Sequence, residues 1–249
     1  MIGVLNVSAA IFSIPMIFLV PAPVGQDWVW IGVSVTVHFC YQLSLARMMG
    51  SADYSLVYPI SRGLGPLVVT VCALLLLNEP LATGQVAAIL VIIAGAVLAG
   101  FASTERLRAP PLQAVLWACL VGLLIGVYTT IDGTAVKRMS PLTFLLWSNL
   151  LIMPPMLAFL YRTEGRTFGQ RMVAASPPAL VMTLIAYSGY TLALFAFRLG
   201  TLAEIAALRE TSILFAAVIG ALWLKERVTS GRITGIALIA AGAIALKSV

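Results

Sequence analysis

The sequence predicts an all-α polytopic membrane protein with nine transmembrane helices arranged as two inverted-topology repeats. Three observations lead to this prediction. Of the 249 residues, 61% are hydrophobic and only 10% are charged, and the mean hydropathy is +1.05. Apolar runs of about twenty residues, the length that crosses a bilayer, recur along the whole chain. Polar residues of one such run also recur in a later run. A soluble core cannot enclose this much apolar surface.

The nine expected spans are joined by short linkers, so no soluble domain fits between them. The longest linkers are residues 103–111 and 162–176. The first apolar run differs from a signal peptide because it lacks a basic start, is too long, and is followed by further spans. The expected spans are residues 2–21, 28–48, 54–77, 83–101, 112–131, 141–161, 177–197, 202–224 and 229–247.

The net charge of +6 comes mostly from short loops such as "RLR" and "KERV". In a membrane protein, loop charges of this sign indicate topology and contact with anionic lipid headgroups rather than nucleic acid. Cys40, Cys72 and Cys119 lie in apolar runs without C-x-x-C spacing, and we expect them to be buried hydrophobic residues. With one histidine in the chain, a metal site is not expected.

A shift of 147 positions superposes residues 62–99 on a later segment. The shift places Arg62 on Arg209, Glu79 on Glu226, and the "AGA" at 94–96 on the "AGA" at 241–243. The third span thus corresponds to the eighth, five crossings later. An odd number of crossings reverses direction, so the two copies run oppositely through the bilayer, as in many secondary transporters.

The predicted domains are residues 1–101, a first repeat of four helices, and residues 112–249, a second repeat of five. A complete pair would have ten helices. We therefore expect a native first helix that precedes residue 1 and matches span 112–131. The genomic sequence upstream of Met1 would test this expectation, and a stop codon directly before Met1 would contradict it.

The repeated turns "ALLLLNEPLATGQ" and "GALWLKERVTSGR", each followed by a glycine-containing helix, resemble EamA-type domains of the drug/metabolite transporter superfamily. The stretch "ADYSLVYPISRG" resembles a subset of bacterial members. The resemblance covers nearly the whole chain. It implies ten helices in two inverted five-helix copies, a transport function and a bacterial inner (plasma) membrane location.

Arg62 is the main candidate for substrate binding. A central arginine costs about 2.5–3.5 kcal/mol on the insertion scale, so we expect it to face the bundle interior. Tyr58 and Ser61 lie near it on the same helix, and Arg209 is its counterpart in the second copy. These arginines could hold a carboxylate or a phosphate. The alternative is that Arg62 pairs internally with Asp132 or Glu210, or extends towards an interface. We also expect Pro59, Gly63, Gly65 and Pro66 to loosen this helix.

Further polar residues lie within the spans. Tyr41, Tyr128, Tyr190 and Asn149 could line a cavity for a small organic solute, although some must serve in packing. His38, Asp132 and Glu210 are candidates for proton coupling. The alternatives are a His38 bonded to a backbone carbonyl, and an Asp132 that caps a helix end. For both residues, the alternative is the favoured interpretation. Glu79 and Glu226 end helices beside turns, which indicates a structural role.

The sequence contains no phosphate-binding G-x-x-x-x-G-K-[ST] motif, so uphill transport would draw on an ion gradient or exchange. The predicted function is export of small polar or anionic metabolites by alternating access, without a cofactor. Expected partners are a small solute and the bilayer; a homodimer is compatible with the fold. The main alternative is a membrane scaffold or accessory subunit. A membrane enzyme would need clustered catalytic groups, and the sequence shows none.

Overall fold

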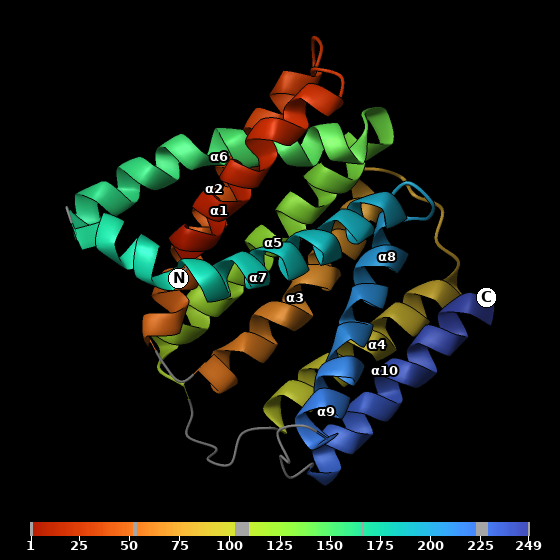
Figure 1. Ribbon diagram of the computed structural model, residues 1–249. Helices are drawn as coiled ribbons and strands as arrows, with labels where there is room; N and C mark the ends of the chain where they lie inside the picture. The colour runs from red at the N-terminus through yellow and green to blue at the C-terminus, as the bar shows by residue number, and fades with distance from the viewer. Residues whose placement is uncertain (1, 52–53, 103–109, 166, 223–228, 249) are drawn as a thin grey trace. The chain divides into compact units, whose positions relative to one another are not determined.

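The computed structural model describes residues 2–51, 54–102, 110–165, 167–222 and 229–248. Within these ranges the ordered elements are all helices (Figure 1). Glu226 and most of the linker at 103–111 lie outside them. The helices are α1 (Ile2–Met16) with the short 3-10 helix η1 (Ile17–Leu19), α2 (Asp27–Ser51), α3 (Tyr54–Leu75), α4 (Thr83–Phe101), α5 (Leu112–Arg138), α6 (Pro141–Glu164), α7 (Thr167–Ala196), α8 (Leu202–Leu208), η2 (Arg209–Thr211), α9 (Ser212–Leu222) and α10 (Ser230–Ser248).

Each predicted span corresponds to one of these helices or to the α8–η2–α9 succession. Among the described residues, seven helical segments are long and apolar enough to cross a membrane. Two shorter apolar segments, Leu5–Leu19 and Leu180–Ala196, fall within the other two predicted spans. The predicted all-α polytopic membrane fold is therefore confirmed. The largest differences are that α5 continues to Arg138 and that α7 begins at Thr167.

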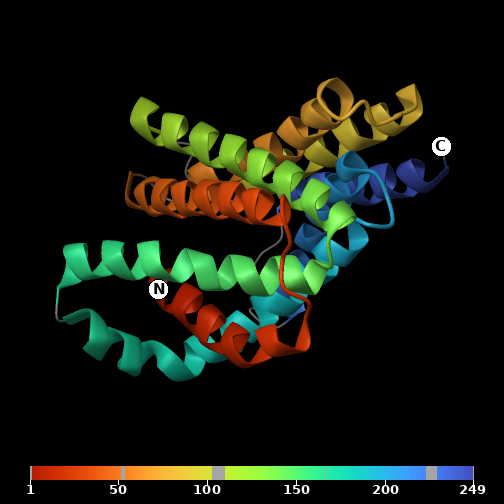
Figure 2. The ribbon, with the colours of Figure 1, turned by 90° about the horizontal axis from the view of Figure 1, so that it is seen from above.

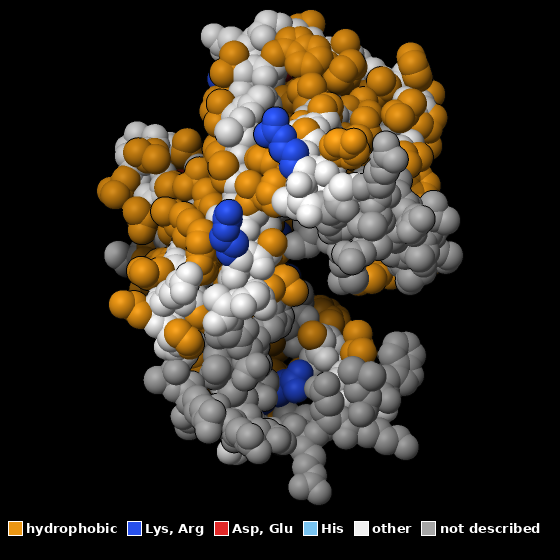
Figure 3. Space-filling model, turned by 90° about the vertical axis from the view of Figure 1, so that its left-hand side faces the viewer, with side chains coloured by type: hydrophobic (Ala, Val, Ile, Leu, Met, Phe, Trp, Pro, Cys, Tyr) orange, Lys and Arg blue, Asp and Glu red, His pale blue; other side chains and the backbone are white. Residues whose placement is uncertain are grey.

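Much of the described surface of the protein is apolar. Large hydrophobic side chains such as Phe18, Leu116 and Ile185 are exposed, and hydrophobic side chains cover much of the described surface in Figure 3. An outer surface of this kind contacts acyl chains. It explains why the expected burial of Cys40 is wrong: this cysteine is exposed, because an apolar residue in a membrane helix can face lipid as well as the core.

The chain forms two compact units. Unit 1 contains Met1–Gln42 and Ile131–Leu199, and unit 2 contains Leu43–Thr130 and Gly200–Val249. Each unit draws segments from both predicted repeats, and α2 and α5 contribute to both units. The compact units are therefore a different division of the chain from the two repeats.

In unit 1, α1 packs beside α6 and α7 (Figure 2). The chain directions of α1 and α6 follow from two contacts. Asn149 donates to the Ser13 hydroxyl at 3.4 Å, and Thr143 donates to the Pro21 carbonyl at 3.3 Å. From Ser13 to Pro21 the chain moves forward past α1, while its partner in α6 moves back from Asn149 to Thr143. The helices α1 and α6 are therefore antiparallel.

In unit 2, α4 and α10 pack closely through glycines and run antiparallel (Figure 1). A Cβ on Gly235 would lie 2.5 Å from the Ala99 nitrogen, and one on Gly95 would lie 2.7 Å from the Gly235 carbonyl oxygen. A Cβ on Gly242 would lie 3.0 Å from the Ala88 oxygen. Small residues permit this close approach of two backbones, a common basis of helix association in membranes.

The helix α3 is continuous, contrary to the expectation that its prolines and glycines would loosen it. Its glycines serve helix packing instead. Gly63 lies against the Val97 side chain, and a Cβ on Gly65 would lie 2.8 Å from Ile125 Cγ2. The eighth span, which corresponds to α3 in the second copy, is the one that is interrupted: the 3-10 helix η2 separates α8 from α9.

Candidate functional site

Unit 1 contains a buried carboxylate that accepts hydrogen bonds from three side chains. Asp132, on α5, has no exposed side-chain surface. The Ser34 hydroxyl donates to its Oδ1 at 2.5 Å, and His38 Nε2 lies 2.8 Å from its Oδ2. The Tyr190 hydroxyl, from α7, donates to the same Oδ2. We call Ser34, His38, Asp132 and Tyr190 the Asp132 cluster.

The favoured interpretation of Asp132 as a helix cap is wrong. The helix α5 continues for six residues past Asp132, to Arg138, so the carboxylate lies within the helix. Lys137 and Arg138 stand in the last turn, where positive charge interacts favourably with the helix dipole and supports the extension. For His38, the partner of Nε2 is a carboxylate, and the His38 and Tyr190 rings meet edge to face at 6.2 Å.

A second polar group in unit 1 surrounds Ser13 on α1. The Ser13 hydroxyl donates to the Ala9 carbonyl at 2.9 Å and lies 3.4 Å from the Tyr187 hydroxyl. The Asn149 amide donates to Ser13 from α6. A small cavity of about 120 Å³ adjoins this group and is lined by Phe12, Ser13, Met16, Leu146, Thr183, Leu184 and Tyr187.

Beside Asn149, two buried polar atoms have no hydrogen-bond partner within the described part of the chain. They are Trp147 Nε1 and the Ser148 hydroxyl oxygen. The Trp147 ring itself meets Trp28 edge to face at 5.1 Å. A buried donor without an acceptor costs free energy. The segment 147–149 of α6 could therefore offer hydrogen-bonding groups to a polar solute.

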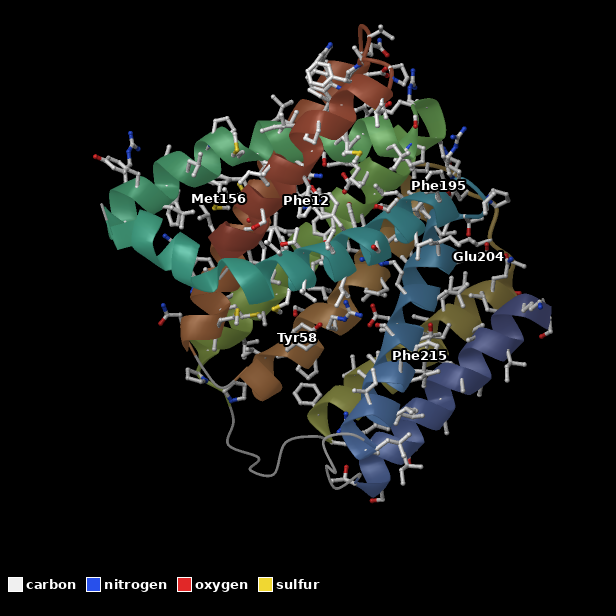
Figure 4. The ribbon with its side chains drawn as sticks, viewed as in Figure 1. Phe12, Tyr58, Met156, Phe195, Glu204 and Phe215 are labelled. Carbon is white, nitrogen blue, oxygen red and sulfur yellow. The ribbon has the colours of Figure 1, made fainter. Side chains whose placement is uncertain are left out.

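In unit 2, Arg62 forms an intramembrane ion pair. Its Nη2 lies 3.0 Å from Glu210 Oε2, and it also donates to the Ser212 hydroxyl at 3.4 Å. The guanidinium carbon stands 5.9 Å from the centre of the Tyr58 ring, which is labelled on α3 in Figure 4. Of the alternatives considered for Arg62, internal pairing with Glu210 is the one present in this structure.

Glu210 is the more buried partner, with 5% of its side chain exposed against 23% for Arg62. It lies in η2, where the helical path from α8 to α9 is interrupted. Arg209, the counterpart of Arg62, is the first residue of η2 and is half-buried. Ser212, at the start of α9, completes the group, which we call the Arg62 cluster: Tyr58, Arg62, Glu210 and Ser212.

The remaining predicted site residues are Ser61, Tyr128 and Tyr41. Ser61 is buried, and its hydroxyl donates to the Tyr58 carbonyl at 2.9 Å within its own helix. Tyr128 is buried on α5, and Tyr41 is half-buried on α2. The bond to the Tyr58 carbonyl joins Ser61 to the Arg62 cluster.

Sequence reasoning missed Ser13 and Ser34, whereas Ser212 shares a helical face with Arg209, three residues before it. Ser34 precedes His38 by four residues, so the two side chains share one face of α2. That spacing could have identified Ser34 once His38 was a candidate. Ser13 gives no comparable signal, because isolated serines are common in membrane helices and its partners come from distant segments.

Two glutamates outside the two clusters, Glu79 and Glu204, have structural roles. Glu79 accepts a hydrogen bond from the Leu202 backbone N–H at 2.8 Å and so binds the start of α8. This contact fits the structural role expected for Glu79. Glu204, labelled on α8 in Figure 4, forms a capping box with Thr201 and accepts from Gln85 at 2.6 Å.

The direction of α3 relative to α8 and α9 follows from these bonds. Arg62 meets Glu210 and Ser212, whereas Glu79 meets Leu202. As the residue number rises from Arg62 to Glu79, the number of the partner residue falls from Glu210 to Leu202. The helix α3 therefore runs antiparallel to the α8–η2–α9 succession. This is the relation expected of corresponding helices in inverted copies.

Comparison with known proteins places the chain in a family. The model of the "EamA-like transporter family" matches residues 112–247, more than half of the chain. No curated protein matches the chain. One crystal structure, described only as that of a "protein", has a TM-score of 0.76 and 17% sequence identity, covering 98% of this chain and 86% of that chain. At this identity the likeness shows the fold alone.

The family model matches six successive helices, from α5 to α10. The chain therefore belongs to the EamA-like transporter family, a group of multi-pass integral membrane proteins.

Proposed function

We propose that this chain is a secondary active transporter that exports small polar metabolites, in particular anionic ones, across the bacterial inner membrane. Its family supports membrane transport in general. The observation that carries the narrower proposal is the Arg62–Glu210 ion pair, which lies within two membrane-spanning segments. Ionisable side chains at such positions are costly and usually mark the pathway of a substrate or an ion.

The Arg62 cluster suits exchange between an internal and an external anion. Glu210 neutralises the Arg62 guanidinium while no solute is bound. A carboxylate or phosphate of the solute would replace Glu210 as the partner of Arg62. The planar guanidinium fork is suited to this role because it can donate two parallel hydrogen bonds to such a group.

The position of Glu210 also favours movement. Transporters with inverted repeats typically bind their substrates where a spanning helix is interrupted. Here Glu210 lies in the 3-10 segment between α8 and α9. In the proposed mechanism, displacement of Glu210 changes this interruption and the two inverted repeats alternate between opposite openings.

In this proposal the chain is a transporter without enzymatic activity of its own. Its partners are a small solute and the surrounding lipid, with no role for nucleic acid or a cofactor. A homodimer is compatible with the proposal, but the transport mechanism does not require one.

The test is solute counterflow in proteoliposomes that contain the full chain. The assay uses labelled small carboxylates, phosphate esters and neutral polar solutes. We expect flux of at least one anionic solute, and we expect Arg62→Ala to abolish it. A lost charge-assisted hydrogen bond of about 1.5–3 kcal/mol corresponds to roughly ten- to hundredfold weaker binding. Arg198→Ala is the matched control, because Arg198 is exposed beyond the end of α7.

The double variant Arg62→Gln/Glu210→Gln separates function from structure. It removes both charges and leaves neither buried group unpaired. A folded double variant without flux supports the proposal, whereas wild-type flux would mean that the pair serves the fold alone. If the wild-type chain moves no solute, the proposal is contradicted and the accessory-subunit alternative is favoured.

A further inference from the structure

The Asp132 cluster contains a carboxylate that the protein keeps buried inside the membrane-spanning part of α5. Its side chain is 0% exposed, and Ser34, His38 and Tyr190 all direct polar groups to it. A buried charge is costly unless it is paired and hydrogen-bonded. These three partners on α2 and α7 supply the hydrogen bonds that a buried carboxylate needs.

His38 is the residue that can change the charge of the cluster. It is the single histidine in the chain. When a neutral imidazole donates from Nε2 to Asp132, the cluster carries one negative charge. A proton taken up by the other ring nitrogen gives an imidazolium–carboxylate pair with no net charge. Histidine is the side chain that most readily makes this change near physiological pH.

The other charged groups described in unit 1 stand at helix ends. Asp27 begins α2, Lys137 and Arg138 end α5, Arg162 lies near the end of α6, and Arg198 follows α7. The helix α1 contains no charged residue. Lys137 is five residues beyond Asp132, about 7.5 Å along the helix axis. The other described titratable side chains along these helices are Tyr187, which lies beside Ser13, Cys40 and Tyr41 on α2, Cys119 and Tyr128 on α5, and Tyr161 on α6.

From this geometry we propose that the Asp132 cluster is a proton-binding site that couples solute movement to a proton gradient. The proposal rests on the transport function proposed above. His38 takes up the proton, because 21% of its side chain is exposed whereas Asp132 is fully enclosed. Asp132 holds the counter-charge.

The shared oxygen provides a route from proton binding to helix movement. His38 and Tyr190 both bind Oδ2 of Asp132, one from α2 and the other from α7. A charged imidazole binds a carboxylate more strongly than a neutral one does. Protonation of His38 therefore strengthens the link between α2 and α5 and weakens the competing link between α5 and α7. Release of the proton reverses the change.

The first test needs no substrate. The full chain, without a histidine tag, is labelled with ¹⁵N-histidine and placed in lipid nanodiscs, where His38 gives a single imidazole spectrum. We expect the spectrum to change from that of the neutral ring to that of the protonated ring between about pH 8 and pH 5. A ring that keeps one protonation state throughout this range overturns the proposal.

The second test compares two kinds of transport in proteoliposomes. Asp132→Asn and His38→Gln should retain solute counterflow but lose accumulation driven by a pH gradient, together with the proton flux that a trapped pH-sensitive dye reports. A purely structural role would reduce both kinds of transport together. Tyr190→Phe should weaken the coupling, whereas Tyr187→Phe on the same helix is the matched control because Tyr187 contacts Ser13.

The outcomes separate this proposal from the proposed transport function. Counterflow without any proton flux in the wild-type chain overturns proton coupling and leaves transport intact. Wild-type coupling in both the Asp132→Asn and His38→Gln variants overturns the assignment of the site. If counterflow is absent for every solute, the proposed transport function is contradicted. Proton coupling is then contradicted as well, even if the His38 imidazole changes its protonation state. If Asp132→Asn does not fold, His38→Gln and Tyr190→Phe provide the same comparison.

Discussion

Two carboxylates, Asp132 and Glu210, are buried in membrane-spanning helices and are compensated in different ways. Glu210 faces the full positive charge of Arg62 at 3.0 Å. Asp132 relies on two hydroxyl groups and an imidazole, whose charge depends on the proton. The first arrangement is neutral as a pair when both groups are charged, whereas the second changes its net charge by one when His38 takes up a proton. This difference is why we assign anion exchange to the Arg62 cluster and proton binding to the Asp132 cluster.

Single and double substitutions of the Arg62–Glu210 pair should have unequal effects on stability. Arg62→Gln leaves a buried carboxylate without its counter-charge, and we expect a loss of about 3 kcal/mol, the low end for buried pairs because Arg62 keeps some exposure. Arg62→Gln/Glu210→Gln should be closer to the wild type. Thermal unfolding of the purified variants in detergent provides the comparison. A double variant less stable than the single one would contradict this account.

At the scale of helices, glycine has one dominant role in unit 2, which is to let backbones approach. The contact between α4 and α10 depends on Gly95, Gly235 and Gly242, and the contacts of α3 depend on Gly63 and Gly65. In the sequence, Gly63 and Gly65 suggested flexibility, because glycine occurs at hinges as well as at close contacts. The helix break between α8 and α9 occurs instead at Arg209–Thr211, a segment without glycine or proline.

Gly235→Ala should destabilise the packing of α4 against α10. The added Cβ would lie 2.5 Å from the Ala99 backbone nitrogen, so the two helices must separate. We expect a cost of about 1–3 kcal/mol, typical of overpacking. Gly189→Ala on α7 is the control, since a Cβ there meets nothing within 4 Å and alanine favours a helix. Equal melting temperatures for the two variants would refute this role of Gly235.

At the scale of the whole molecule, helices that correspond between the predicted repeats lie beside each other and run antiparallel. This holds for α1 with α6, for α3 with α8–α9 and for α4 with α10. Each of these comparisons lies within one compact unit. The pattern is the one that two copies of opposite orientation produce, and it motivates a direct test of the predicted repeat.

Thr83 and Ser230 begin α4 and α10, are exposed, and are related by the repeat shift of 147 positions. In a chain whose native cysteines are replaced by alanine, Thr83→Cys and Ser230→Cys should react with a membrane-impermeant thiol reagent from opposite sides. Labelling of spheroplasts and of inverted vesicles measures the two sides separately. Reaction of both cysteines from the same side would contradict inverted topology.

The sequence by itself determined the class of this protein, the approximate positions of its nine spans, and most of the residues that form the two clusters. It could do so because lipid imposes a minimum length on each apolar helix and makes each ionisable residue within it conspicuous. Only the tertiary structure decided that Glu210 pairs with Arg62, that Asp132 joins His38 and Tyr190, and that the glycines of α3 serve contact. Those facts depend on which helix faces which, because a partner in space can be more than a hundred residues away in the chain, as Arg62 and Ser212 are.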